Sequence, residues 1–147
     1  MRNRASGWVY WNLVLDKRGG PNLAGNFVDS PAYVHNASSF ILNPSFFYLS
    51  HFSRAIPPGS VAVDANVTCT AYHSEYCQYV AFRTPLGHVA VVMTNDEITN
   101  NIVPGAFAPH LSWGEGKAIE WVVSCGGHIV NGSLPWKGIQ TLVMPCA

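Results

Sequence analysis

The stretch from Cys77 to Met93, CQYVAFRTPLGHVAVVM, decides the fold. β-Branched and aromatic residues dominate Cys77–Arg83 and Val89–Met93, and Pro85-Leu86-Gly87 lies between these two runs. Such side chains pack well on a pleated surface, whereas Pro and Gly favour turns. The stretch therefore predicts two antiparallel strands joined by a short turn.

Further strands are predicted on both sides of this pair. Val61–Thr70 alternates in polarity before the pair, and Ile119–Cys125 and Ile139–Met144 are short apolar runs after it. Asn131-Gly132 is a dipeptide typical of a two-residue hairpin turn. Short strands separated by turn residues indicate an antiparallel β-sandwich, which we expect to cover residues 60–147.

The first 59 residues have a different pattern. Gly7–Leu15 is an apolar, aromatic run that predicts one strand, and the strand-breaking cluster Gly19-Gly20-Pro21-Asn22 follows it. Phe46–Ser53 has the apolar spacing of a helix, with Asn43-Pro44 as its start and Ile56-Pro57-Pro58-Gly59 as its stop. A strand, a long loop and a helix form one βα unit of a barrel. We therefore expect a boundary between two different architectures near Pro57–Ser60.

Composition excludes several classes of protein. Hydrophobic residues make up 48% of the 147 residues and charged residues 11%, against roughly 25% charged residues in ordinary soluble domains. Disordered chains are polar and rich in charge, so an ordered chain is expected. Eight basic and eight acidic residues leave no electrostatic footprint for nucleic acid. A surface with so little charge indicates either that glycans cover it or that a large part of it is buried against more protein.

Cysteines and glycosylation motifs indicate the secretory pathway. The chain has an even set of cysteines, and three Asn-x-Ser/Thr motifs mark candidate glycosylation sites. The cysteines are Cys69, Cys77, Cys125 and Cys146, and the candidate glycosylation sites are Asn36, Asn66 and Asn131. Four cysteines allow three connectivities. We favour the local pairs Cys69–Cys77, which flank a short polar connection, and Cys125–Cys146, which bracket the predicted hairpin.

The amino terminus lacks the apolar segment of a signal peptide, although Met1-Arg2-Asn3-Arg4 is basic. A secretory protein without this segment is expected to be a piece of a longer protein or the product of an incomplete gene model. No apolar run reaches the length of about 18 residues that a membrane-spanning helix needs.

No residue set marks a metal or cofactor site. The six histidines lack metal-binding spacing, and His73, between Cys69 and Cys77, is interpreted as a bystander of a disulfide. Retaining glycoside hydrolysis needs two carboxyl groups about 5–5.5 Å apart, and no pair of acids here is marked for that role. Asp29 lies between apolar groups and is expected to bond backbone amides rather than to act as an acid or base.

Three aromatic residues, Trp8, Tyr10 and Trp11, stand together in the predicted first strand. Indole rings stack on sugar C–H faces and donate through their N–H group. Aromatic clusters more often belong to a core, so the pattern by itself leaves both interpretations open.

These same residues carry a resemblance to a known family. Gly7–Leu13, followed by Gly19–Asn22 and Asn26–Pro31, resembles the last barrel strand and following loop of animal glucosylceramidases, in glycoside hydrolase family 30. Phe47–Arg54 and Ile56-Pro57 resemble the next helix and its exit. The match is specific over roughly the first sixty residues, and Val91–Asn95 and Gly138–Met144 match more loosely.

The resemblance implies a mostly β chain: the last βα unit of a (β/α)₈ barrel in residues 1–59, then a carboxy-terminal antiparallel β-sandwich in residues 60–147. It implies a retaining β-glucosidase that hydrolyses glucosylceramide to glucose and ceramide, without a cofactor, in a lysosomal or extracellular location. Both catalytic glutamates of the family lie on earlier barrel strands. We therefore expect no catalytic residue here and no activity from the isolated chain. The resemblance also allows a lipid-presenting activator protein and a membrane surface as partners.

Family residues that border the glucose pocket correspond to Trp11 and Asn26, with Asn12 and Phe27 as a supporting shell. The chain departs from the family at Val9-Tyr10, where Thr-Asp is usual, and at Leu23 and Gly25, where Trp and Arg are usual. These changes alter the pocket rim and leave aglycone preference open. The alternative function is that of a non-catalytic secreted β-sandwich that binds sugar or glycolipid.

Overall fold

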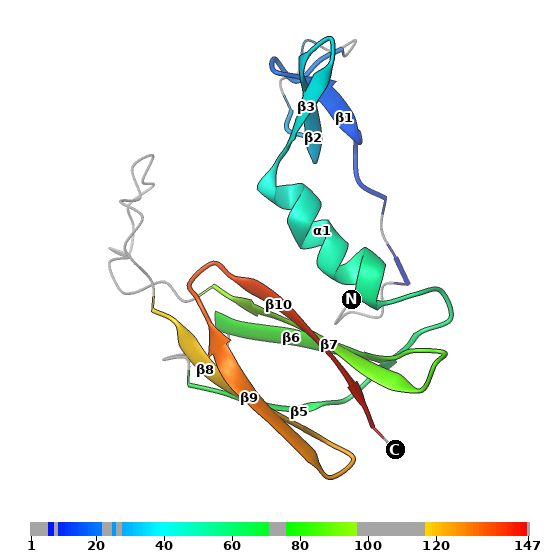
Figure 1. The fold of residues 1–147 in the computed structure, drawn as a ribbon, viewed down its shortest axis with the longest axis vertical. Helices are drawn as coiled ribbons and strands as arrows, with labels where there is room; N and C mark the ends of the chain where they lie inside the picture. The colour runs from blue at the N-terminus through cyan, green and yellow to red at the C-terminus, as the bar shows by residue number, and fades with distance from the viewer. Residues whose placement is uncertain are drawn as a thin grey trace. The chain divides into compact units, whose positions relative to one another are not determined.

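A computed structural model describes residues 6–7, 9–21, 25, 28–70, 76–96 and 117–146. The fold is mostly β, as the sequence predicts, and the described part contains one α-helix among its strands (Figure 1). The chain divides into two compact units, Met1–Ala55 and Ile56–Ala147.

The first unit is a small mixed sheet followed by a helix. Strand β1 (Val14–Asp16) is parallel to β2 (Ala32–Asn36), which is antiparallel to β3 (Ser39–Leu42). Helix α1 (Pro44–Ala55) follows, and Phe46 N donates to Asn43 O at 2.9 Å. Pro suits the first helical position because that residue needs no N–H partner. The helix confirms the predicted one and extends beyond it by two residues at each end.

The predicted strand Gly7–Leu15 is wrong in its extent. β2 pairs with Val14–Asp16, and the described residues before Val14 form no strand. Asn12 has a φ of 58°, in the left-handed region, where an extended run ends. The expected long loop also contains the β2–β3 hairpin. Because the turn of this hairpin is polar, the pattern of apolar residues did not indicate the hairpin.

The second unit is the predicted β-sandwich. One sheet has the order β10-β7-β6-β4, and the other has the order β5-β8-β9. All pairings in both sheets are antiparallel. The strands are β4 (Val61–Val63), β5 (Asn66–Cys69), β6 (Cys77–Arg83), β7 (His88–Asn95), β8 (Ile119–Cys125), β9 (His128–Leu134) and β10 (Ile139–Pro145). Figure 1 shows the two sheets as separate layers within this unit.

The core of the sandwich is built by inward-facing residues of both sheets. Val91 and Met93 of β7 and Ile119 and Val123 of β8 belong to one buried cluster, each with an exposed fraction of 1% or less. Because alternate residues of a strand face opposite sides, each sheet supplies every second residue to this cluster.

Val61–Thr70, predicted as one strand, is two strands that belong to different sheets. β4 pairs with β6, and β5 pairs with β8, so the chain crosses between sheets at Asp64-Ala65. Val63, Ala65 and Val67 all pack against the core cluster. Alternation therefore continues through the crossing, which is why the sequence pattern did not reveal it.

The predicted turn at Asn131-Gly132 is also wrong. Both residues lie inside β9, and the β8–β9 turn is formed by Gly126-Gly127, whose φ angles of 55° and 79° are both positive. A two-residue hairpin turn of type I′ needs positive φ at both central residues, which Gly adopts without steric cost.

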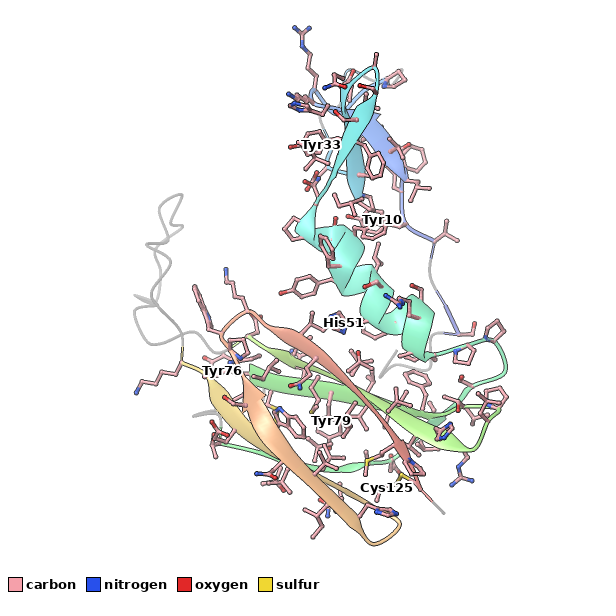
Figure 2. All side chains as sticks on the ribbon, viewed as in Figure 1. Tyr10, Tyr33, His51, Tyr76, Tyr79 and Cys125 are labelled. Carbon is pink, nitrogen blue, oxygen red and sulfur yellow. A yellow bond between two sulfur atoms is a disulfide. The ribbon has the colours of Figure 1, made fainter. Side chains whose placement is uncertain are left out.

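Both predicted disulfides are present, and each joins the two sheets. Cys69 of β5 is bonded to Cys77 of β6, and Cys125 of β8, which is labelled in Figure 2, is bonded to Cys146, directly after β10. Cys77 pairs in register with Asn95, at the opposite end of the four-stranded sheet from Pro145. The two bonds therefore connect the sheets at opposite ends of the sandwich.

Candidate functional site

An open, polar cavity of about 360 Å³ lies in the first unit, at the carboxyl end of β1. In barrels built from βα units, this end of the strands is the one that carries active sites. The lining residues are Asp16, Lys17, Gly19, Val28, Asp29, Ser30, Tyr33 and Asn43. Tyr33, on β2, is labelled in Figure 2.

Asp16 closes the turn that follows β1. Its Oδ1 accepts hydrogen bonds from Arg18 N at 2.7 Å and Gly20 N at 2.9 Å. The Gly20 amide, followed by the Arg18 amide, holds the pKa of Asp16 below its usual value of 3.8, because these bonds favour the charged form. Asp16 is therefore a carboxylate at neutral pH, and it is poorly suited to act as a general acid.

Asp29 connects the cavity wall at Ser30 to Asn43, at the start of helix α1. Its Oδ1 accepts from Ser30 N at 2.8 Å and from Asn43 Nδ2 at 2.7 Å, and Asn43 Nδ2 also lies 2.6 Å from Ser30 O. Ser30 is buried, and its hydroxyl donates to Ala32 O. The expected bond between Asp29 and a backbone amide is thus confirmed, and this network holds the wall in place.

The cavity suits a ligand with several hydroxyl groups. Carboxylate oxygens accept hydrogen bonds, and the ammonium group of Lys17 donates them. Asn43 Nδ2 is already engaged with Asp29 and Ser30, so Asn43 can offer a ligand only its Oδ1 as an acceptor. Sequence reasoning singled out Asp29 among these residues and did not single out Asp16. Tyr33 and Asn43 were missed as site residues. The position of Asp16 just after a predicted barrel strand was the signal that would have found it.

Trp11 and Asn12, the two predicted sugar-site residues that the structure describes, do not line this cavity. Trp11 precedes β1 and is 74% exposed, so its indole ring does not belong to a core formed by the described residues of the first unit. Asn12, next to it, is half-buried. Asn26 and Phe27 lie outside the described residues. The role of these four residues in sugar binding stays a prediction.

The three glycosylation motifs all place their Asn on the surface. Asn36 ends β2, and its Oδ1 accepts from Ser38 N at 2.9 Å and Ser38 Oγ at 3.1 Å. Asn66 and Asn131 are exposed residues of β5 and β9. Use of the three sites stays a prediction.

Within the described residues, no group of three or more His, Cys, Asp or Glu side chains is arranged to hold a metal ion. His73 lies outside that part of the chain. No described helix is long and apolar enough to cross a membrane.

Comparison with known proteins identifies relatives of both units. Residues 1–56 match the glycosyl hydrolase family 30 TIM-barrel domain. The chain is 42% identical over 91 residues to lysosomal acid glucosylceramidase of Mus musculus, a match that covers 61% of this chain and 17% of that protein. It is 29% identical over 149 residues to the endo-1,6-β-D-glucanase neg1 of Aspergillus fumigatus, covering 100% of this chain and 27% of the relative.

The fold is shared with a solved structure. SrfJ from Salmonella typhimurium superposes with a TM-score of 0.68 and 24% sequence identity, over 93% of this chain and 26% of that one. The chain matches 12–18% of the length of the glucosylceramidases related to it. The chain resembles glycoside hydrolase family 30 in sequence, and its mostly β fold fits the carboxy-terminal region of such enzymes.

Proposed function

We propose that this chain forms the last βα unit and the β-sandwich of a glucosylceramidase-type retaining β-glucosidase. The observation that carries the proposal lies in residues 1–56. They match the family's barrel domain, and the same residues hold a polar cavity at the carboxyl end of β1. The groups that line this cavity can bind hydroxyl groups of a β-glucoside, while Trp11, which does not line the cavity, is proposed to stack on the glucose ring.

The chain by itself is proposed to be inactive. Retaining hydrolysis needs a protonated acid and a second carboxylate about 5–5.5 Å apart. Asp16 has a lowered pKa, and the Oδ1 atom of Asp29 is engaged with Ser30 and Asn43. Asp16 is therefore not prepared as the protonated partner, and Asp29 is engaged in holding the cavity wall. The two glutamates of the parent enzyme supply the chemistry, and this chain contributes to sugar binding.

Residues 1–59 are assigned to the last strand, loop and helix of the barrel, and residues 60–147 to the sandwich. In this arrangement Trp11 and Asn26 border the glucose site, while Asn12 and Phe27 support it. The exposed indole of Trp11 supports this assignment, because an exposed ring is available for stacking on a sugar.

A lysosomal or extracellular location, with a role in sphingolipid breakdown, follows from the same proposal. Two disulfides and the similarity to a lysosomal glucosylceramidase support it. Disulfides persist in oxidising compartments and are rare in the cytosol. The substrate class is then glucosylceramide or a related β-glucoside, with a lipid-presenting activator protein and a membrane surface as partners.

Two measurements on the purified chain test this function. With a chromogenic β-glucoside we expect no turnover. Saturation-transfer NMR with methyl β-glucoside should show weak binding that is lost in Trp11→Ala. Leu13→Ala is the matched control, since Leu13 is also exposed on the same segment. Turnover that disappears in Asp16→Asn or Asp29→Asn would show that the chain carries its own catalytic acids and would overturn the assignment.

A further inference from the structure

Two of the three glycosylation motifs lie on strands, and there their spacing has a structural meaning. An Asn-x-Ser/Thr motif places its two functional residues two positions apart, which is also the period of side chains along a strand. Asn66-Val67-Thr68 lies in β5 and Asn131-Gly132-Ser133 lies in β9. In both motifs the Asn and the hydroxyl residue therefore face the same side of the sheet.

The middle residue of each motif decides which side that is. Val67 packs against the core cluster, and Gly132 faces the ring of Trp121, which is buried in the core. Asn66, Thr68, Asn131 and Ser133 accordingly point away from the core, and all four are exposed. Both motifs thus open onto the outer face of the three-stranded sheet.

β8 separates the two asparagines. Asn66 is in register with Ser124, and Asn131 is in register with Val122. Neighbouring strands lie about 4.8 Å apart, so the two Asn residues are about 10 Å apart across the sheet and offset by two residues along it. Val122 lies between them on the same face, and 41% of its surface is exposed.

We infer that this outer face carries a pair of N-linked glycans, on Asn66 and Asn131, which close it to protein partners. The inference rests on the secretory-pathway part of the proposed function and not on the glycosidase part. In the modification, Asn Nδ2 forms a bond to the anomeric carbon of an oligosaccharide carried on a lipid diphosphate. The C–O bond to the diphosphate breaks, the diphosphate leaves with the electron pair, and the amide nitrogen loses one proton.

The pair also protects both edges of the sheet. Among the described residues, β5 and β9 are its edge strands, and neither contains a Lys, Arg, Asp or Glu. Unprotected edge strands pair with other chains, and charged side chains are a common defence. A bulky, hydrated glycan on each edge strand supplies this defence instead. It also covers Val122 and Ile129, the latter 74% exposed.

Glycan occupancy is the first test. The full chain is expressed behind a cleavable signal peptide in a eukaryotic secretory host, and its mass is measured before and after peptide N-glycosidase treatment. Asn66→Gln and Asn131→Gln should each lower the mass by one glycan. Thr68→Ala and Ser133→Ala should each also lower the mass by one glycan, although both Asn residues are intact. This result would show that loss of the motif, and not a folding defect of the Asn variants, removes the glycan. If either Asn variant keeps the glycan mass of the wild-type chain, the proposed pair of glycans on Asn66 and Asn131 is wrong, whether or not Asn36 is glycosylated.

Access to the face is the second test. Val122→Cys is labelled with a bulky maleimide, with Leu86→Cys as control, because Leu86 is 81% exposed in the β6–β7 turn. Labelling at position 122 should be several-fold slower in the glycosylated chain than in the Asn66→Gln, Asn131→Gln background, with no change at position 86. Equal rates at position 122 would show that the face is open. Neither result depends on β-glucoside binding, so failure here is distinct from failure of the proposed function.

Discussion

Gly132 on β9 lies directly opposite Trp121 on β8, and a Cβ at position 132 would stand 2.6 Å from Trp121 Cζ2. That separation is far inside van der Waals contact. Trp121 is buried, and its Nε1 lies 3.1 Å from Gln140 Oε1 of the other sheet, so the ring is held from both sides. Glycine at position 132 is what allows the indole to lie between the sheets.

Gly132→Ala is therefore expected to destabilise the sandwich. Overpacking of a filled core costs about 1–3 kcal/mol, which chemical denaturation measures as a lower midpoint. In the chain produced without glycans, Ser133→Ala is the neighbouring control, and a change within about 0.5 kcal/mol is expected there because Ser133 is exposed. Combining Gly132→Ala with Trp121→Phe should give less than the sum of the two single effects, since the smaller ring leaves room for the new methyl group. If the losses of stability in the two single variants added up strictly in the double variant, a contact between position 132 and Trp121 would be contradicted.

Asn95 is expected to be a second sensitive position in the core. It is 1% exposed, and its Nδ2 donates to Lys117 O at 2.8 Å and Leu134 O at 3.0 Å. Asn95→Leu removes both bonds and leaves buried carbonyl groups without this donor, at a cost of about 1–3 kcal/mol for each unsatisfied group. Denaturant titration against Thr94→Val, on the same strand, measures the difference. A stability equal to that of the control would show that these carbonyls find other donors.

The two disulfides should stabilise the sandwich nearly independently, because they join the sheets at opposite ends. Replacing either pair with serine is expected to cost about 2–5 kcal/mol. Cys125–Cys146 spans 21 residues and Cys69–Cys77 spans 8, so chain entropy predicts the larger loss for the first pair. Thermal unfolding of the two double variants and of the quadruple variant tests both points. A quadruple effect well below the sum would mean that the two ends are coupled.

Asp16 should make the β1 turn sensitive to acid. Its pKa is lowered in the folded chain, so its contribution to stability is full above the ordinary value of 3.8 and is lost as the pH falls through the folded pKa. NMR hydrogen exchange of the Arg18 and Gly20 amides should therefore speed up, relative to the intrinsic rate, below about pH 4. Asp16→Asn should abolish this pH dependence. The same profile in wild type and variant would exclude Asp16 as its cause.

Much of the local structure could be predicted from the sequence. Cys77–Arg83 and Ile119–Cys125 are strands with the predicted bounds, because β-branched and aromatic residues are enriched in strands, where they pack well on the pleated surface. Asn43-Pro44 marked the helix start, since Pro suits its first position. The local disulfide pairing also followed from spacing along the chain. These features depend mainly on residues close together in sequence.

The errors arose where a distant partner decides the structure. β1 is short because β2 pairs with only three of its residues, and Val61–Thr70 divides because its two halves pair with different strands. At position 132, Trp121 rather than a turn requires glycine. The cavity likewise combines Asp16, Asp29 and Asn43, which no local pattern connects.

The sequence by itself thus determined the β-rich class, the helix start, the cysteine pairs and the resemblance over the first sixty residues. Each of these features depends on residues that are close together in the chain. Only the tertiary structure decided the sheet to which each strand belongs, and hence the shared outer face of Asn66 and Asn131. Strand pairing joins residues far apart in the chain, and alternation along one strand carries no information about which neighbour it will meet.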